Sequence, residues 1–135
     1  MNQPTRPGIS TRPRLFGILN LTPDSFSDGG QHNASAEVAA DFAASLVADG
    51  ADAIDIGAES TRPGSEEVPA DEENRRLLPV LKLIRGRFPD LFLSIDTRKA
   101  DVADAALAAG ADCINDVSGL QFDSRMVDAV ASHHA

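Results

Sequence analysis

Short apolar runs alternate with longer stretches of helical periodicity along most of the chain, and this alternation restricts the fold more than any other feature. Four of the runs have the length and composition of buried strands, at residues 15–19, 53–56, 91–95 and 113–114. A polar loop and a stretch with helical periodicity follow each of the first three runs. Regular βα alternation predicts a parallel sheet with right-handed crossovers.

The stretches between the strands carry helix signals of their own. Val38, Phe42 and Leu46 recur at four-residue spacing, which predicts one apolar helix face. A second helix is expected to begin near Pro69, with acidic residues in its first turn that suit the helix dipole. Pro79 lies within that helix and is expected to kink it or split it in two.

Two segments that lie two βα units apart have nearly the same six-residue sequence. Residues 50–55 read Gly-Ala-Asp-Ala-Ile-Asp, and residues 110–115 read Gly-Ala-Asp-Cys-Ile-Asn. Each begins with a glycine that is expected to end a helix, and each continues into an apolar strand. Thr97 is expected to cap the helix over residues 99–109, and a last helix is expected after Asp123. The repetition supports one series of βα units without a domain boundary.

These signals predict an α/β fold of the TIM (β/α)8 barrel type, with about the first four βα units in this chain. Residues 1–13 are expected to form a flexible N-terminal tail, and residues 14–135 the N-terminal half of the barrel domain. A complete barrel takes about 250 residues. The 135-residue polypeptide alone is therefore expected to self-associate or to stay partly molten. A sharp, concentration-independent thermal transition of a monomer would contradict this expectation.

Composition excludes several classes of partner. The formal net charge is −9, which argues against nucleic acid and against an anionic membrane surface as the main partner. Cys113 is the one cysteine, so no intrachain disulfide can form, and its apolar neighbours predict an inert core thiol. The first residues lack the apolar segment of a secretory signal, and no stretch is long enough to span a bilayer. A cytoplasmic location is expected.

Polar side chains stand at the end of every predicted strand. Asn20 follows the first strand, Asp55 lies in the second, Asp96 follows the third, and Asn115 follows the fourth. In a (β/α)8 barrel the carboxyl ends of the strands form the active-site face. Any one of these residues could cap a loop, but four together favour a ligand site.

Two polar loops leave the same predicted edge. Residues 20–30 are dense in oxygen ligands and in turn-forming glycine and proline. Residues 59–64 combine hydroxyl groups with Arg62, which suits a phosphate or a carboxylate. A surface connector is the alternative for either loop. No phosphate-binding P-loop, dinucleotide fingerprint or Cys/His zinc cluster occurs in the sequence.

In order along the chain, these segments resemble the dihydropteroate synthases of the folate pathway. The matching text is GILNLTPDSFSDGG at residues 17–30, DIGAESTRPG at 55–64, SIDT at 94–97 and INDVSG at 114–119. The resemblance implies a TIM-barrel transferase. Members of that family condense 6-hydroxymethyl-7,8-dihydropterin pyrophosphate with p-aminobenzoate, which gives dihydropteroate and pyrophosphate.

The resemblance also implies roles for individual residues. Asn20 is implied to help hold the Mg²⁺ that accompanies the pyrophosphate, and Asp96 and Asn115 to line the pterin pocket. Asp96 is the implied catalytic residue, because a carboxylate near the ring favours the positive charge that develops there. The loops implied to close around the pterin pyrophosphate and p-aminobenzoate include Phe26, Thr61, Arg62 and Pro63.

The family's site has a second half, with another Asp, a Lys and a late Ser/Arg/His segment that this chain does not contain. Independent turnover is therefore not expected to be strong. The family's dimers use helices of that second half, so the association of this chain is left open. Two alternatives also stay open: a pterin-dependent methyltransferase-type barrel, and a non-catalytic pterin-binding half-barrel.

Overall fold

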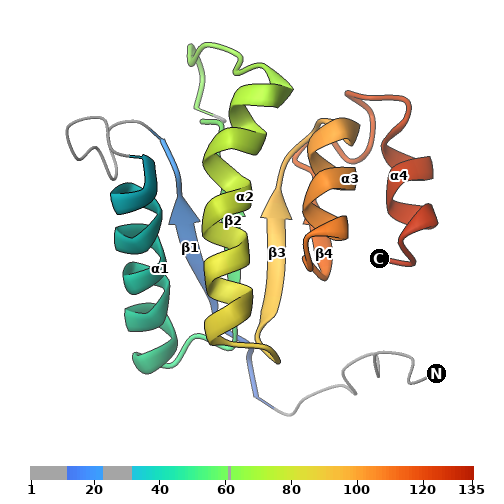
Figure 1. Cartoon of the computed structure of the whole chain (residues 1–135). Coiled ribbons are helices and arrows are strands. Elements are labelled where there is room, and N and C mark those ends of the chain that lie inside the picture. Colours follow the sequence, from blue (N-terminus) through green and yellow to red (C-terminus); the bar gives the residue numbers. More distant parts are fainter. Residues whose placement is uncertain (1–11, 23–31, 61) are drawn as a thin grey trace.

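The computed structural model describes residues 12–22, 32–60 and 62–135, and it shows four strands with helices packed on one face (Figure 1). The elements in chain order are β1 (Phe16–Asn20), α1 (His32–Ala48), β2 (Ala53–Gly57), α2 (Ala70–Arg87), β3 (Phe92–Asp96), α3 (Ala100–Ala108), β4 (Cys113–Asn115) and α4 (Met126–Ser132). The four strand positions predicted from the apolar runs are therefore confirmed to within one residue at each end.

The strands form one parallel sheet in the order β1-β2-β3-β4. A helix connects each strand to the next, and α1, α2 and α3 lie side by side against the sheet (Figure 1). Neighbouring strands that follow one another in the sequence, with helices outside, are the arrangement of consecutive βα units in a barrel. The predicted parallel α/β architecture is confirmed, and it comprises four strands of a partial barrel.

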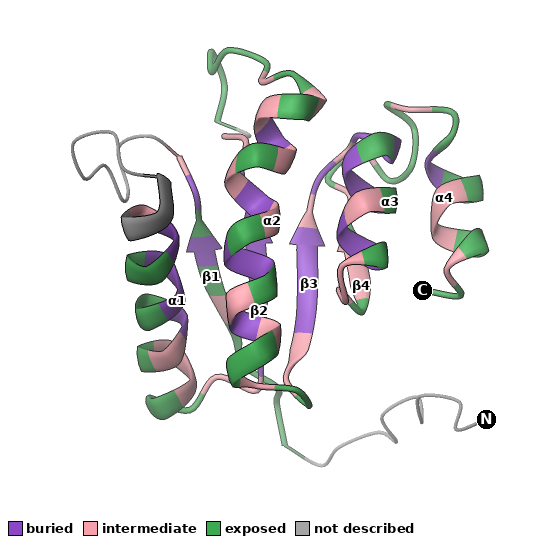
Figure 2. Cartoon of the chain, viewed as in Figure 1, coloured by how far each residue is buried: buried purple, intermediate pink, exposed green. Residues whose placement is uncertain are grey.

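The two faces of the sheet differ in character because side chains alternate along each strand. The face toward the helices holds fully buried aliphatic side chains, namely Leu19, Ile54, Ile56, Leu93 and Ile95. Figure 2 shows the buried positions gathered where the helices meet the sheet. The hydrophobic core therefore lies between sheet and helices, which leaves the opposite face for other groups.

The packing face of α1 differs from the prediction. Val38 and Phe42 are exposed, and the buried positions are occupied by alanines: Ala36, Ala39, Ala40 and Ala43. A methyl side chain lets the helix axis approach the sheet closely, so the small residues face the core and the larger ones point outward. The four-residue spacing identified the helix correctly, but of its three residues only Leu46 packs against the core.

Pro79 does not split α2, which runs without interruption from Ala70 to Arg87. A proline removes one backbone N–H, so the carbonyl of Arg75 loses its helical partner. Pro79 and Arg75 both lie on the exposed side of the helix. Water can satisfy that carbonyl there, which explains why the helix continues.

The two Gly-Ala-Asp segments make the same kind of hydrogen bond to a neighbouring strand segment. The carboxylate of Asp52 accepts a hydrogen bond from the backbone N–H of Leu15 at 2.9 Å. The carboxylate of Asp112 accepts one from the N–H of Leu93 at 2.8 Å. In each unit an aspartate before one strand thus binds a backbone N–H at the start of the neighbouring strand, just before β1 for Leu15 and within β3 for Leu93. The repetition seen in the sequence reflects a repeated tie between neighbouring strands.

Arg85 closes the end of the sheet opposite the polar strand ends. Its guanidinium donates to the carbonyl of Gly110 at 2.7 and 3.0 Å, to that of Pro89 at 2.7 Å and to that of Leu91 at 2.8 Å. It also pairs with Asp112 at 2.7 Å. One planar side chain therefore joins α2 to the turns before β3 and β4.

We expect Arg85→Lys to lower the free energy of unfolding by about 2 kcal/mol, because an ammonium cannot reach several separated acceptors at once. Urea denaturation followed by circular dichroism would measure the change. Arg75→Lys is the matched control, since Arg75 is exposed and its ion pair is with Glu72 of its own helix. Equal effects of the two substitutions would contradict the assignment.

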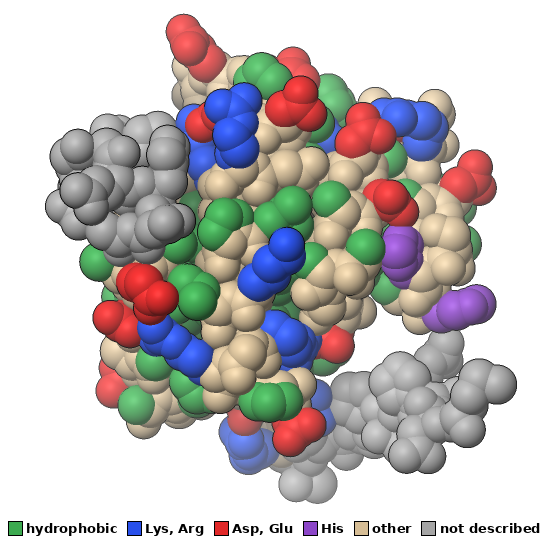
Figure 3. All heavy atoms as spheres, in the orientation of Figure 1, with side chains coloured by type: hydrophobic (Ala, Val, Ile, Leu, Met, Phe, Trp, Pro, Cys, Tyr) green, Lys and Arg blue, Asp and Glu red, His purple; other side chains and the backbone are tan. Residues whose placement is uncertain are grey.

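Ion pairs of both signs cover the outer surface, and Figure 3 shows acidic and basic side chains interspersed over the helix-covered face. Arg87 of α2 pairs with Asp41 of α1 at 2.6 Å and also with Glu37. Most of the predicted tail, residues 1–13, lies outside the described residues, and its Arg12 pairs with Asp52. Among the described residues, no helix combines the length and the apolar character needed to cross a bilayer.

Candidate functional site

Polar groups from β1, β3 and β4 meet at one edge of the sheet. The register places Asn20 beside Gly57, Gly57 beside Asp96, and Asp96 beside Asn115. Each is the last residue of its strand, so the four form a row across the carboxyl ends of the parallel strands. The side chains of Asn20, Asp96 and Asn115 lie on the face away from the helices, because the flanking Leu19 and its equivalents point into the core. We call this the upper row.

A second row lies one pleat below on the same face and consists of Ile18, Asp55, Ser94 and Cys113. Asp55 is only 7% exposed, and its carboxylate accepts a hydrogen bond from the Asn115 amide at 3.2 Å. Cys113 is half-buried in this row and not in the core on the helix side, and burial raises the pKa of its thiol. The two rows are joined by the contact between Asp55 and Asn115.

Asp96 carries the most perturbed carboxyl group of the two rows. Partial burial, followed by the nearby carboxyl groups of Asp55, Glu73, Asp116 and Glu59, raises the pKa of Asp96 from 3.8 to about 6. Burial and neighbouring negative charge both disfavour the ionised form. A cationic or N–H-rich ligand edge beside Asp96 would reverse that effect, and a strongly perturbed carboxyl at a strand end is typical of a functional site.

The pH dependence of stability follows from this shift. Because the pKa of Asp96 is raised to about 6 in the folded chain, the folded state binds the proton more tightly than the unfolded state. The Asp96 contribution is therefore fully favourable below about pH 4 and is lost as the pH rises to about 6. We expect the stability difference between the wild type and Asp96→Asn to change over that window. Urea denaturation from pH 4 to 7 would measure it, and a constant difference would contradict it.

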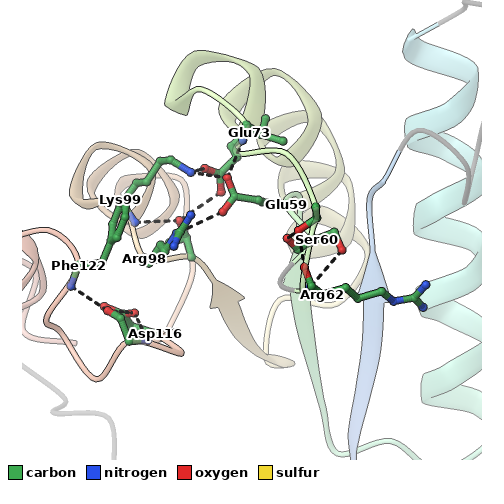
Figure 4. Close-up of polar contacts among 12 residues, drawn as sticks. Glu59, Ser60, Arg62, Glu73, Arg98, Lys99, Asp116 and Phe122 are labelled. Carbon is green, nitrogen blue, oxygen red and sulfur yellow. Dashed lines mark hydrogen bonds and ion pairs between the residues drawn. The ribbon is translucent and has the colours of Figure 1, made fainter.

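The loop after β2 is held in a compact turn. Glu59 accepts the backbone N–H of Val68 at 2.8 Å, which closes the loop at its base. The hydroxyl of Ser65 lies 2.7 Å from the carbonyl oxygens of both Ser60 and Arg62 and shares its one proton between them. The side chain of Arg62 is exposed and points away from Glu59 (Figure 4). An arginine on a backbone braced in this way can reach an anion at the upper edge of the sheet.

A buried ion cluster anchors that loop to α2 and to the start of α3. The ammonium of Lys99 lies 2.5 Å from Glu59 and 2.7 Å from Glu73 (Figure 4), and all three side chains are at most 10% exposed. Arg98 adds a 3.4 Å ion pair to Glu59, and Thr97 donates to Glu73 at 3.3 Å. Sequence reasoning placed Glu73 among acidic residues at a helix start and missed this cluster.

The contacts in this cluster shift the pKa values of Lys99, Glu59 and Glu73. Burial alone would lower the pKa of Lys99, but its hydrogen bonds to two glutamates outweigh burial and raise it. Burial tends to raise the pKa of Glu59 as well, and the contacts with Lys99 and Val68 lower it. Burial prevails at Glu73, whose pKa is raised. The single ammonium therefore stabilises Glu59 in its charged form more fully than Glu73.

The loop after β4 completes the edge. Asp116 accepts the backbone N–H and the hydroxyl of Ser118, at 2.8 and 2.7 Å. The guanidinium of Arg98 lies 3.9 Å from the centre of the Phe122 ring, an attractive cation–π contact. A hollow of about 230 Å³ opens between this loop and the loop after β2, lined by Glu59, Ser60, Arg62, Ser65, Arg98 and Val117.

The N-terminus of α3 is capped differently from the prediction. Thr97 accepts the N–H of Lys99 at 3.2 Å, one residue before the helix. The first helical N–H, at Ala100, is bound by the Asp123 carboxylate at 2.9 Å. Hydrogen bonds from Arg125 and from backbone N–H groups lower the pKa of Asp123 to about 2. A carboxylate from a later loop therefore serves as the cap that was assigned to the local threonine.

The structure thus brings three of the predicted site residues into one row, namely Asn20, Asp96 and Asn115. Arg62 and Pro63 lie in the adjoining loop and are exposed. Phe26 and Thr61 lie outside the described residues. Asp55 was noted in the sequence only as a polar strand residue, and its contact with Asn115 makes it part of the same group.

Few of the described side chains are placed to bind a divalent cation. Within residues 12–22, 32–60 and 62–135, no group of three or more His, Cys, Asp or Glu side chains is placed to hold a metal ion. Asn20 offers one exposed amide oxygen at the end of β1. Mg²⁺ is commonly held by one or two protein oxygens together with substrate phosphates and water. These residues therefore fit a cation that arrives with a phosphorylated ligand.

A parallel sheet with a carboxylate and two amides along its strand ends, and an arginine loop beside them, is typical of a barrel-type α/β fold with a ligand site at the strand ends. The chain belongs to the family of pterin binding enzymes, whose family pattern matches residues 16–135. Two similar proteins are the dihydropteroate synthases of Clostridium beijerinckii, 47% identical over 93% of this chain, and of Bacillus subtilis, 45% identical over 98% of it. The chain covers 46% of each of these relatives.

Solved structures of dihydropteroate synthases also resemble this chain over about half of their length. A dihydropteroate synthase of Xanthomonas albilineans with 4-aminobenzoic acid superposes with a TM-score of 0.82 at 50% identity, over 90% of this chain and 44% of that one. The Clostridium difficile enzyme in the presence of pteroic acid gives a TM-score of 0.87 at 48% identity, over 93% and 47%. The chain therefore spans about half the length of these relatives, and it follows their fold closely over that half.

Proposed function

We propose that this chain carries the pterin-binding part of a dihydropteroate synthase site. The reaction would join 6-hydroxymethyl-7,8-dihydropterin pyrophosphate to p-aminobenzoate and release pyrophosphate. The row of Asn20, Asp96 and Asn115 across three strand ends is the observation that supports this most directly. The names of the relatives favour the synthase over a methyltransferase-type barrel.

The pterin would lie on the upper row. The Asp96 carboxylate can accept N–H groups of the ring, and the Asn115 amide offers an acceptor and a donor to the same edge. Departure of pyrophosphate leaves positive charge on the methylene and the ring. The ionised Asp96 carboxylate would stabilise that charge, and the positive charge would in turn offset the burial and the acidic neighbours that raise the pKa of Asp96.

The pyrophosphate would lie between Asn20 and the loop after β2. Asn20 and the phosphate oxygens would hold Mg²⁺ there, and the cation would neutralise the leaving group. Arg62 would add a second positive charge with donors in a planar fork. Phe26, Thr61 and Pro63 are proposed to border the pyrophosphate and p-aminobenzoate positions. The association state of this chain stays open, and a cytoplasmic location stays a prediction.

Calorimetric titration with the dihydropterin pyrophosphate, with and without Mg²⁺, tests the proposal. We expect saturable binding that Mg²⁺ strengthens and that Asn20→Ala weakens mainly when Mg²⁺ is present. Asp90→Asn, at an exposed turn, is the control for a lost carboxylate. Absence of binding would contradict the proposal. Binding of methyltetrahydrofolate, without any response to p-aminobenzoate, would favour the methyltransferase alternative.

A further inference from the structure

Asp55 is a buried carboxylate that stability does not explain. It lies in the middle of β2, in the row below Asp96, and is 7% exposed. One oxygen accepts the Asn115 amide at 3.2 Å, while its Oδ1 is buried without a hydrogen-bond partner among the described residues. A buried acceptor that lacks a partner lowers the stability of the folded state. A side chain kept at such a cost needs an explanation outside folding.

The contact with Asn115 constrains which way that amide points. An asparagine amide has an acceptor end and a donor end, and the two can exchange by a half-turn about the last side-chain bond. A carboxylate accepts and does not donate, so Asp55 requires the Nδ2 end of Asn115 to face it. The Oδ1 end of Asn115 therefore points away from Asp55.

The other end of the amide belongs to the upper row. Asn115 is exposed and stands beside Asp96 in the register of β3 and β4. With Nδ2 directed at Asp55, the Asn115 oxygen and the Asp96 carboxylate present two acceptors side by side. Such a pair suits a flat ligand edge that carries neighbouring N–H groups. It disfavours an edge that places an acceptor opposite the Asn115 oxygen, because two acceptors would then face each other.

We propose that Asp55 is a positioning residue, which fixes the orientation of the Asn115 amide so that its oxygen is presented with Asp96 to a donor-rich heterocycle edge. The inference rests on the proposed function, because it concerns how the same site selects its pterin. Asp55 acts through Asn115 and does not itself touch the ligand. Asp55 thereby determines which hydrogen-bond pattern of a ligand the site can bind. Its unpaired oxygen lowers the stability of the folded state.

For Asp55→Asn we expect a loss of pterin affinity without a loss of pyrophosphate affinity or of thermal stability. We expect affinity for the dihydropterin pyrophosphate to fall about tenfold, because an amide in place of the carboxylate can donate and allows the Asn115 amide to turn over. Affinity for inorganic pyrophosphate with Mg²⁺ should stay unchanged, since that ligand lacks the ring. The thermal midpoint should stay equal or rise, because a costly buried charge has been removed. Ser94→Ala, in the same row, is the control, with little change expected in either affinity.

An exchange of the two side chains gives a second and sharper test. Asn115→Asp alone places two carboxylates against each other and should weaken pterin binding at least as much as Asp55→Asn. In the double variant that combines both substitutions, the amide introduced on β2 can donate to the carboxylate introduced on β4. That carboxylate again presents an oxygen to the ligand. We expect the double variant to bind within about threefold of the wild type, a strongly non-additive result.

Several outcomes would overturn the inference. Wild-type pterin affinity in Asp55→Asn, equal losses for pterin and pyrophosphate ligands, or additive losses in the double variant would each do so. If the wild-type chain binds Mg²⁺-pyrophosphate but not the pterin ligand, the proposed function fails and this inference fails with it. If the wild type binds the pterin ligand and only the Asp55 effects are absent, the proposed function stands and this inference alone is wrong.

Discussion

Replacing Lys99 by Met should lower the free energy of unfolding by about 3–5 kcal/mol near neutral pH, because it breaks a buried ion pair and leaves its partners uncompensated. Lys99 is the ammonium between Glu59 and Glu73, at 2.5 and 2.7 Å. Without it, two carboxylates would be buried next to each other with Arg98 as the remaining cation nearby. Methionine fills a similar volume, so the loss of stability would result from the missing positive charge and not from a cavity.

The pH dependence separates this explanation from simple loss of packing. Two unpaired buried carboxylates take up protons more readily, so the Lys99→Met variant should recover stability as the pH falls from 7 toward 5. Chemical denaturation at several pH values would measure the recovery. Lys82→Met is the matched control, because Lys82 is exposed on α2. A loss that does not change with pH would contradict the charge argument.

Replacing Asp96 by Asn should weaken binding of the dihydropterin pyrophosphate by about 10- to 100-fold, because a charged acceptor at the ring edge is lost. The same change should leave stability equal or higher at pH 7. Burial and acidic neighbours raise the pKa of Asp96 to about 6, so its ionised form is unfavourable in the folded chain without ligand. Opposite effects on affinity and stability distinguish a ligand-binding carboxylate from a structural one.

Calorimetry for affinity and urea denaturation for stability, on the same samples, would make this comparison. Asp90→Asn again serves as the control for removal of a carboxylate from the surface. A variant that binds as tightly as the wild type but unfolds more easily would assign Asp96 to the scaffold. That result would also remove the main support for a pterin site on the upper row.

The parts of the fold that sequence predicted well are those that follow from local periodicity. The apolar runs located all four strands, and the polar residues at their ends identified the upper row before any register was known. Alternation along a strand needs no knowledge of distant residues. Parallel topology then brings the strand ends together, which explains why Asn20, Asp96 and Asn115 could be grouped from sequence.

The parts that sequence missed depend on contacts between distant segments. Lys99 meets carboxylates from two other segments, and no spacing along the chain connects them. The α3 cap supplied by Asp123 is also non-local, so the nearby Thr97 was chosen in its place. The exposed Val38 and Phe42 show a third limit, because hydrophobicity alone ranks them above alanine for burial. Close approach of α1 to the sheet reverses that ranking.

The alternation along the strands has an evolutionary consequence. Ile54 and Ile56 hold the core together, whereas Asp55 between them and Gly57 after them lie on the opposite face of the sheet, where we propose the ligand site. Ligand chemistry and fold maintenance are therefore encoded in interleaved but separate positions of one short strand. A lineage can exchange polar groups at the ligand-facing positions while the aliphatic ones stay constant. New specificities can then arise on this scaffold without a new core.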